Sequence, residues 1–68
     1  MDIAILFGQR LKEIRTQKGF SQEKLAAIAG FNRTYISKIE RGERIVSIKT
    51  VASLAHALEV EVKELFDF

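Results

Sequence analysis

The chain has 68 residues, of which 47% are hydrophobic and 29% are charged, with no cysteine, one histidine and a formal net charge of +2. This length accommodates a single domain, and the composition is typical of a folded globular protein. Without cysteine there are no disulfides or thiol nucleophiles, and one histidine does not assemble a zinc site. The longest apolar run, residues 3–7, is far shorter than the roughly 20 residues that cross a bilayer, so we expect a cytoplasmic protein.

The positive charge is concentrated in the first part of the chain. Residues 1–44 contain nine Lys or Arg and five Asp or Glu, whereas residues 45–68 contain two and four. Such a separation of charge indicates an anionic partner. A soluble surface with uneven charge is the alternative interpretation.

The first half of the chain predicts three helices. Residues 7–18 carry apolar side chains at intervals of four and three and end at Gly19, and residues 3–7 either lengthen this helix or pack on the last one. Ser21 is the expected N-cap of a helix that ends at Gly30. The connection has only three residues, 30–32, and Asn32 is the expected N-cap of the next helix, which ends before Gly42.

The second half predicts two more helices. Ser47 is the expected N-cap of the first, which has an apolar stripe at Ile48, Val51, Ala52, Leu54, Ala55 and Leu58. A short fifth helix follows with Val62, Leu65 and Phe66, although Glu61 is a poor N-cap for it. The prediction is therefore an all-α, five-helix domain over residues 1–68.

Two short helices joined by a three-residue turn with a glycine are the signature of a helix-turn-helix, here at residues 22–41. Ala26 lies where the second helix must cross the first closely. Ile36 and Ile39 are expected to face inward. The residues left on the outer surface are Arg33, Thr34, Ser37 and Lys38.

The segment SQEKLAAIAGFNRTYISKIERG strongly resembles the helix-turn-helix of lambda-repressor and Cro-like transcription regulators, the Xre family. The segments RLKEIRTQKG and SIKTVASLAHALEV look like the first and fourth helices of that fold. RTYISKIERGER followed by SIKT is also similar to the controller proteins of restriction-modification systems. The resemblance spans nearly the whole chain and implies a compact lambda-repressor-like domain.

The resemblance implies a sequence-specific regulator of transcription, a repressor or an activator, that binds double-stranded DNA. The helix from Arg33 would enter the major groove, and Arg33 would read guanine with its guanidinium. Asn32 is an N-cap first, Gln22 would contact a phosphate, and Tyr35 either contacts a phosphate or packs in the core. The candidate DNA-binding residues are Gln22, Asn32, Arg33, Thr34, Tyr35, Ser37, Lys38 and Arg44.

The resemblance also implies a buried structural ion pair between Arg15 and Glu40. It further implies a homodimer on a near-palindromic operator, with half-sites about 34 Å apart, and a contact with RNA polymerase if the protein activates. Residues 45–68 are the candidate dimerisation region, unless their apolar side chains simply close the core. The candidate interface residues are Val60, Val62, Leu65, Phe66 and Phe68.

Other functions have weaker support in the sequence. His56 has no patterned acid–base partner, and no phosphate-binding loop or nucleophile motif occurs, so we do not expect an enzyme. We also expect no cofactor, no metal, no membrane partner and no small-molecule ligand. The alternative function is an antitoxin-like module whose main partner is a toxin protein and whose DNA binding is secondary.

Overall fold

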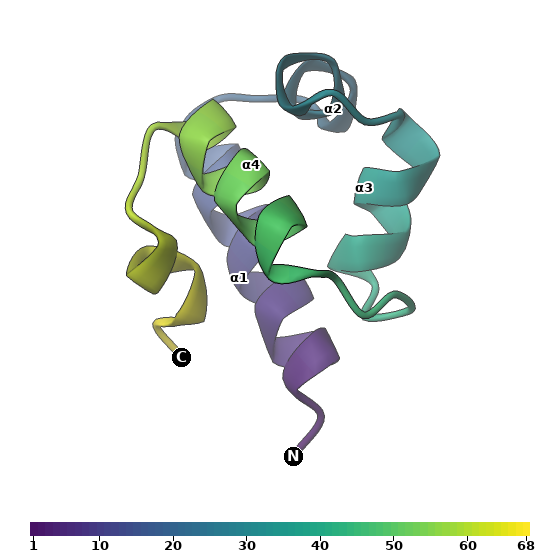
Figure 1. Cartoon of the computed structure of the whole chain (residues 1–68), viewed down its shortest axis with the longest axis vertical. Coiled ribbons are helices and arrows are strands. Elements are labelled where there is room, and N and C mark those ends of the chain that lie inside the picture. Colours follow the sequence, from purple (N-terminus) through teal and green to yellow (C-terminus); the bar gives the residue numbers. More distant parts are fainter.

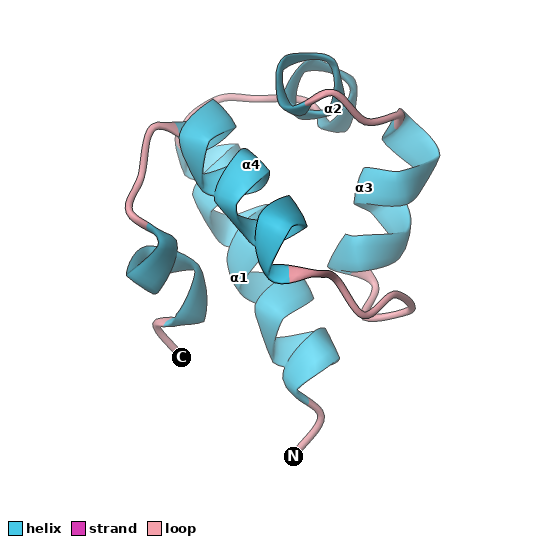
Figure 2. Ribbon diagram, viewed as in Figure 1, coloured by secondary structure: helices cyan, strands magenta, loops and turns pink.

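The computed structural model describes all 68 residues and contains four α-helices, one 3-10 helix and no strand. The elements are α1 (Ile3–Gln17), α2 (Gln22–Ala29), α3 (Arg33–Glu40), α4 (Ile48–Leu58) and the 3-10 helix η1 (Val62–Phe66). Helices α1 and α4 form the centre, with α3 on one side, η1 on the other and α2 across one end (Figures 1 and 2). None of these helices is both long enough and apolar enough to traverse a lipid bilayer.

The prediction of five α-helices is wrong at the last element. Residues 62–66 form a 3-10 helix, in which the Glu64 N–H donates to the carbonyl oxygen of Glu61 over 3.0 Å. This three-residue spacing produces a tighter coil than an α-helix and is common in short terminal segments. The segment is fixed to the domain by Leu65, which is fully buried, and by Arg10 Nε, which donates to the Glu64 carbonyl oxygen over 2.8 Å.

The helix starts follow from local capping. The predicted N-caps Ser21, Asn32 and Ser47 are confirmed, because each side chain accepts a backbone N–H from the first turn of its helix. The side chain of Asp2 caps α1 in the same way. Residues 3–7 therefore lengthen α1, which is one of the two arrangements that the sequence allowed.

All four α-helices end in a left-handed turn whose final N–H bonds back to a carbonyl oxygen five residues earlier. These bonds run from Phe20 to Arg15, Phe31 to Ala26, Glu43 to Lys38 and Val60 to Ala55. The residue with positive φ is Gly19, Gly30 or Gly42 in the first three turns and Glu59 in the fourth. Glycine suits this position because it has no Cβ, so Glu59 is under backbone strain.

Gly8 has a different role, because it lies inside α1 and is buried. A Cβ atom built on Gly8 would lie 2.3 Å from the carbonyl oxygen of Ile39 and 2.8 Å from that of Glu40. The end of α3 can therefore rest directly on the backbone of α1. This contact fixes how far α3 stands from the centre of the fold.

The core contains 13 buried hydrophobic residues drawn from all five elements. Ala26 is 2% exposed, as expected for a small residue at a close helix crossing. Three placements from apolar spacing are wrong. Ile48 and Ala52, placed in the apolar stripe of α4, are exposed, Ile48 by 89%, and Leu65, placed at a dimer interface, is completely buried within its own chain. Helical spacing identifies one face of α4. Ile48, at the start of that face, extends beyond the elements that cover the rest of it.

Candidate nucleic-acid interface

The outer face of α3 carries the residues that the sequence singled out. Ile36 and Ile39 are buried against the core, whereas Arg33 and Thr34 at the start of the helix are exposed. Ser37 and Lys38, one turn further along, are half-buried. Because α3 lies at the side of the fold, this face is open along its length (Figure 1).

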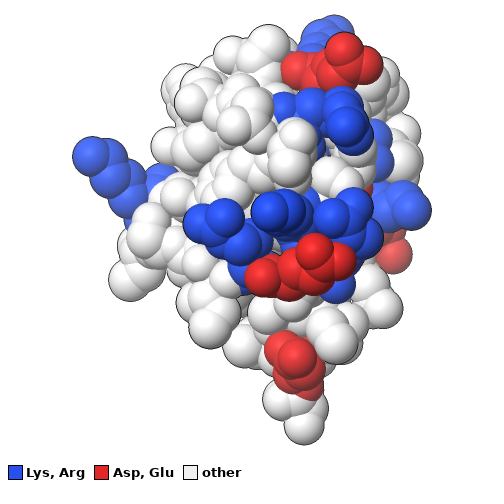
Figure 3. Space-filling model, turned by 90° about the vertical axis from the view of Figure 1, so that its right-hand side faces the viewer, with Lys and Arg blue, Asp and Glu red and all other residues white.

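Positive charge gathers on the same side of the molecule. Figure 3 views the fold from the side of α3 and shows a cluster of Lys and Arg side chains with acidic atoms among them. The basic residues near this face are Arg33, Lys38, Arg41 and Arg44. Clustered cations of this kind raise the local concentration of an anionic partner.

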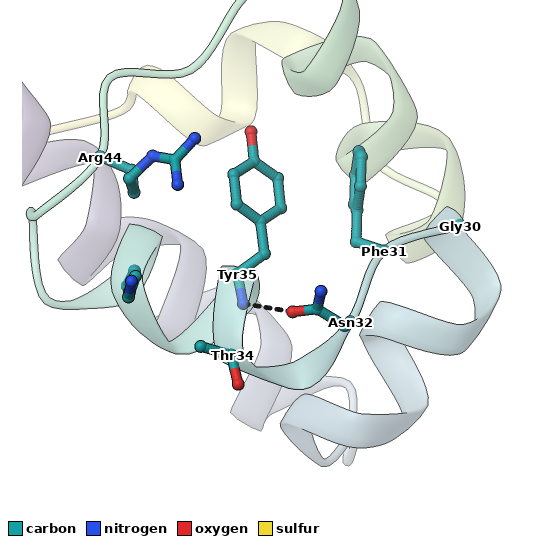
Figure 4. A pocket seen from close by; sticks show the side chains of 7 residues that line it. Gly30, Phe31, Asn32, Thr34, Tyr35 and Arg44 are labelled. Carbon is teal, nitrogen blue, oxygen red and sulfur yellow. Dashed lines mark hydrogen bonds between the residues drawn. The ribbon is translucent and has the colours of Figure 1, made fainter.

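Tyr35 supports Arg44 beside the turn between α2 and α3. The Tyr35 ring lies between Phe31 and Arg44 (Figure 4), with its centroid 5.0 Å from that of Phe31 and 5.1 Å from the guanidinium carbon of Arg44. Its hydroxyl is 3.5 Å from Oγ1 of Thr50. The ring thus packs on the edge of the core and also holds the Arg44 cation over its face. These residues border an open hollow of about 600 Å³.

Asn32 and Gln22, both predicted contact residues, form hydrogen bonds within the chain. The side-chain oxygen of Asn32 accepts the Tyr35 N–H over 2.8 Å, as its N-cap role requires. Nε2 of Gln22 donates to Oε1 of Glu40 over 3.0 Å. Gln22 therefore joins the start of α2 to the end of α3.

Arg15 and Glu40 form a buried ion pair below this face. Nε of Arg15 donates to Oε2 of Glu40 over 2.6 Å, and Nη2 donates to Oε1 over 3.1 Å. A third bond runs from Arg15 Nη1 to the carbonyl oxygen of Phe20 over 2.7 Å. No buried side-chain nitrogen or oxygen in the structure lacks a hydrogen-bond partner. The pair ties α3 to α1 and, through Gln22, to α2.

Sequence reasoning missed a second ion pair, at the end of α3. Nε of Arg41 donates to Oε2 of Glu43 over 2.7 Å, and Nη1 donates to Oγ of Ser37 over 2.5 Å. The hydrogen bond from Arg41 lowers the pKa of the Glu43 carboxyl, and the same bond raises the pKa of Arg41. The spacing of four residues predicts that Ser37 and Arg41 are neighbours, but no sequence signal places Glu43 beside them.

An exposed apolar surface lies next to the basic face and was also missed. A groove of about 280 Å³ runs between the start of α1, the loop after α3, the start of α4 and η1. Its most exposed apolar side chains are Ile3, Ile45, Ile48 and Phe66. The available signal is the pair Ile45 and Ile48, with only Val46 and Ser47 between them. Helical spacing assigns Ile48 to the apolar stripe of α4, and Ile45 lies in the loop before it.

The sequence profile of the helix-turn-helix family HTH_3 matches residues 11–65. The chain belongs to the helix-turn-helix family of DNA-binding transcriptional regulators. The match covers α2, α3 and the turn between them, which are the elements that present the basic face. It confirms the resemblance to Xre-like regulators.

Relatives place the chain more closely within this family. Control protein C.BamHI from Bacillus amyloliquefaciens is 48% identical over 68 residues, covering 98% of this chain and 84% of that protein. Control protein C.SmaI from Serratia marcescens is 42% identical over 65 residues, covering 96% and 77%. The crystal structure of the restriction-modification controller protein C.AhdI from Aeromonas hydrophila has a TM-score of 0.93 at 48% identity, covering 97% of this chain and 100% of that one.

Proposed function

We propose that this protein controls a restriction-modification system by binding a near-palindromic operator as a homodimer, with α3 in the major groove. The observation that carries the proposal is the outer face of α3, where Arg33, Thr34 and Ser37 extend from a helix fixed to the rest of the fold. The buried pair of Arg15 and Glu40 supports the reading role, because it holds α3 in one orientation. Bound at a promoter in the cytoplasm, the dimer would exclude RNA polymerase or recruit it.

Each group on this face has a suitable chemical role. Arg33 is exposed at the first residue of α3, where its planar fork can bond to O6 and N7 of guanine. Thr34 and Ser37 offer hydroxyls to base edges or phosphates. Lys38 and Arg44 supply charge to the phosphate backbone, which positions the helix without reading sequence.

The apolar groove supports a dimer interface at the start of the candidate dimerisation region, residues 45–68, rather than at the candidate residues Val60 to Phe68. Ile45 and Ile48 are 91% and 89% exposed, and Ile45 follows Arg44 directly in the chain. A two-fold contact between two copies of this surface would bury both isoleucines and keep the two α3 helices on one side of the dimer. Among the candidate interface residues predicted from the sequence, Val60 packs against the core. Val62, Phe66 and Phe68 are the exposed ones.

Selection from randomised duplex DNA tests the function. We expect the protein to enrich a palindrome, and Arg33→Ala to reduce its affinity by about 1 to 3 kcal/mol for each half-site with the helical content intact. Lys63→Ala is the matched control, because it removes the same charge from η1 on the opposite side of the fold (Figure 1). Equal binding by Arg33→Ala and the unmodified protein would contradict the proposal.

Salt titration provides a second measurement. With six to eight phosphate contacts in each dimer, the logarithm of the binding constant should fall with the logarithm of the salt concentration at a slope of about −5 to −7. A flat dependence, together with a stable complex with an unrelated protein, would favour the antitoxin-like alternative.

Analytical ultracentrifugation tests the dimer surface. The double variant Ile45→Ser with Ile48→Ser should dissociate the dimer, since it removes the exposed apolar groups of the groove. Val62→Ser, which alters η1 outside the groove, should leave the dimer intact. The reverse result would place the interface on η1, among the candidate interface residues that the sequence predicts.

A further inference from the structure

Glu43 carries negative charge on the side of the molecule proposed to face DNA. It lies in the loop after α3, between Arg41 and Arg44, and its side chain is 52% exposed. Figure 3 shows acidic atoms within the Lys and Arg cluster on this side. A carboxylate at this location repels phosphates and weakens binding to any duplex. What Glu43 does to the neighbouring side chains therefore bears on how the protein binds DNA.

The turn at the end of α3 determines where Glu43 lies. Gly42 has φ +74°, and the Glu43 N–H donates to the Lys38 carbonyl oxygen over 2.9 Å. A Cβ atom built on Gly42 would lie 2.9 Å from Cα of Ile5, so the turn is held against α1. The chain therefore folds back and brings the Glu43 carboxylate to the guanidinium of Arg41.

The carboxylate occupies the binding edge of the arginine. Oε2 of Glu43 accepts from Nε of Arg41 over 2.7 Å, and Oε1 accepts from Nη2 over 3.3 Å. This is the bidentate arrangement that arginine also uses to bind a phosphate. While Glu43 holds this edge, Arg41 cannot offer it to the DNA backbone.

The remaining nitrogen of Arg41 acts on a predicted reading residue. Nη1 donates to Oγ of Ser37 over 2.5 Å, one helical turn earlier on the outer face of α3. With its oxygen accepting this bond, the Ser37 hydroxyl has its own proton free to donate outward. Ser37 is therefore prepared to donate to an acceptor on a base edge.

We propose that Glu43 is a specificity-determining residue, which holds Arg41 against Ser37 and away from the phosphates. It lowers affinity for every duplex, and by fixing the donor direction of Ser37 it increases the preference for the operator. The inference rests on the proposed DNA-reading role of α3. Glu43 acts through Arg41 and is a positioning residue that need not touch DNA.

The test compares four variants with the unmodified protein: Glu43→Gln, Arg41→Ala, the two combined, and Glu59→Gln. Affinities are measured for the operator selected by the unmodified protein and for a scrambled duplex of equal length, across a range of salt concentrations. Glu59→Gln removes the same charge beyond the end of α4 and is the matched control. Circular dichroism checks that each variant is folded.

We expect Glu43→Gln to bind the scrambled duplex more tightly and to lose roughly threefold to tenfold of the operator preference. Its salt slope should steepen by about 1.8 for a dimer, because each freed Arg41 gains one phosphate contact. In the Arg41→Ala background the same substitution should leave the operator preference unchanged. Glu59→Gln should match the unmodified protein.

Two results would overturn the inference and leave the proposed function standing. In the first, the protein selects an operator but Glu43→Gln keeps both its preference and its salt slope. In the second, Glu43→Gln reduces the operator preference equally with and without Arg41, so that Glu43 acts by charge alone. If the unmodified protein selects no duplex at all, the proposed function and the inference both fail.

Discussion

Arg15 of α1 and Glu40 of α3 form a bidentate ion pair in which each residue is only 8% exposed. Gln22 of α2 donates to the same carboxylate, so one acidic group joins three helices. The carboxylate lies at the end of α3. Any disturbance of the pair therefore changes the position of the helix that carries Arg33.

Removing one partner of this pair should strongly destabilise the fold. Glu40→Ala leaves the Arg15 guanidinium buried and without its counter-charge, which costs about 3 to 5 kcal/mol. Urea unfolding followed by circular dichroism measures the loss. The double variant Arg15→Met with Glu40→Leu should recover most of the stability, because it removes both charges and fills the space. A double variant no more stable than Glu40→Ala would contradict this account.

Gly8→Ala should destabilise the protein by about 1 to 3 kcal/mol. Alanine normally stabilises a helix relative to glycine, so the expected sign is the reverse of the usual one. The reason is that the added Cβ would meet the carbonyl oxygens of Ile39 and Glu40 at 2.3 and 2.8 Å. Gln9→Ala, at the exposed neighbouring position of α1, should have little effect. A rise in the melting temperature of Gly8→Ala would show that α3 does not rest on α1.

Glu59→Gly should stabilise the protein, because Glu59 adopts a left-handed φ of 58° at a turn where the other three helices have glycine. Relief of a strain of about 1 to 2 kcal/mol exceeds the added entropy of the unfolded chain, which is about 0.4 to 1 kcal/mol. Differential scanning calorimetry should record a higher melting temperature. Gly19→Glu is the converse substitution, at φ 78° with no atom within 4 Å of a new Cβ. It should lower the melting temperature.

The pair of Arg41 and Glu43 should make stability depend on pH in the acid range. The hydrogen bond from Arg41 lowers the pKa of Glu43 in the folded state. The contribution of this pair to folding stability is therefore complete above the ordinary carboxyl pKa of about 4.3. It is lost as the pH falls through the lowered pKa of Glu43 in the folded protein. Urea unfolding from pH 7 to pH 2 should show the stability difference between the unmodified protein and Glu43→Gln shrinking with acid. That trend should vanish in the Arg41→Ala background.

The local features of this fold could be predicted from the sequence. Ser21, Asn32 and Ser47 are N-caps because each bonds to an N–H within its own first turn. Gly19, Gly30 and Gly42 end helices because the left-handed turn is a property of one residue and its immediate neighbours. The outer face of α3 followed from helical spacing. All these interactions connect residues fewer than six positions apart.

The tertiary structure decided everything that depends on which surfaces meet. It buried Leu65, exposed Ile48 and gave Gln22 a partner 18 residues away. It also brought Glu43 back to Arg41, because the turn at Gly42 is held against α1. Spacing along the chain assigns a side chain to a face of its own helix, whereas burial and pairing depend on how neighbouring helices cover that face. The sequence by itself therefore determined the helix-turn-helix and predicted the residues on its outer face, and only the packing of the helices decided how those residues are held.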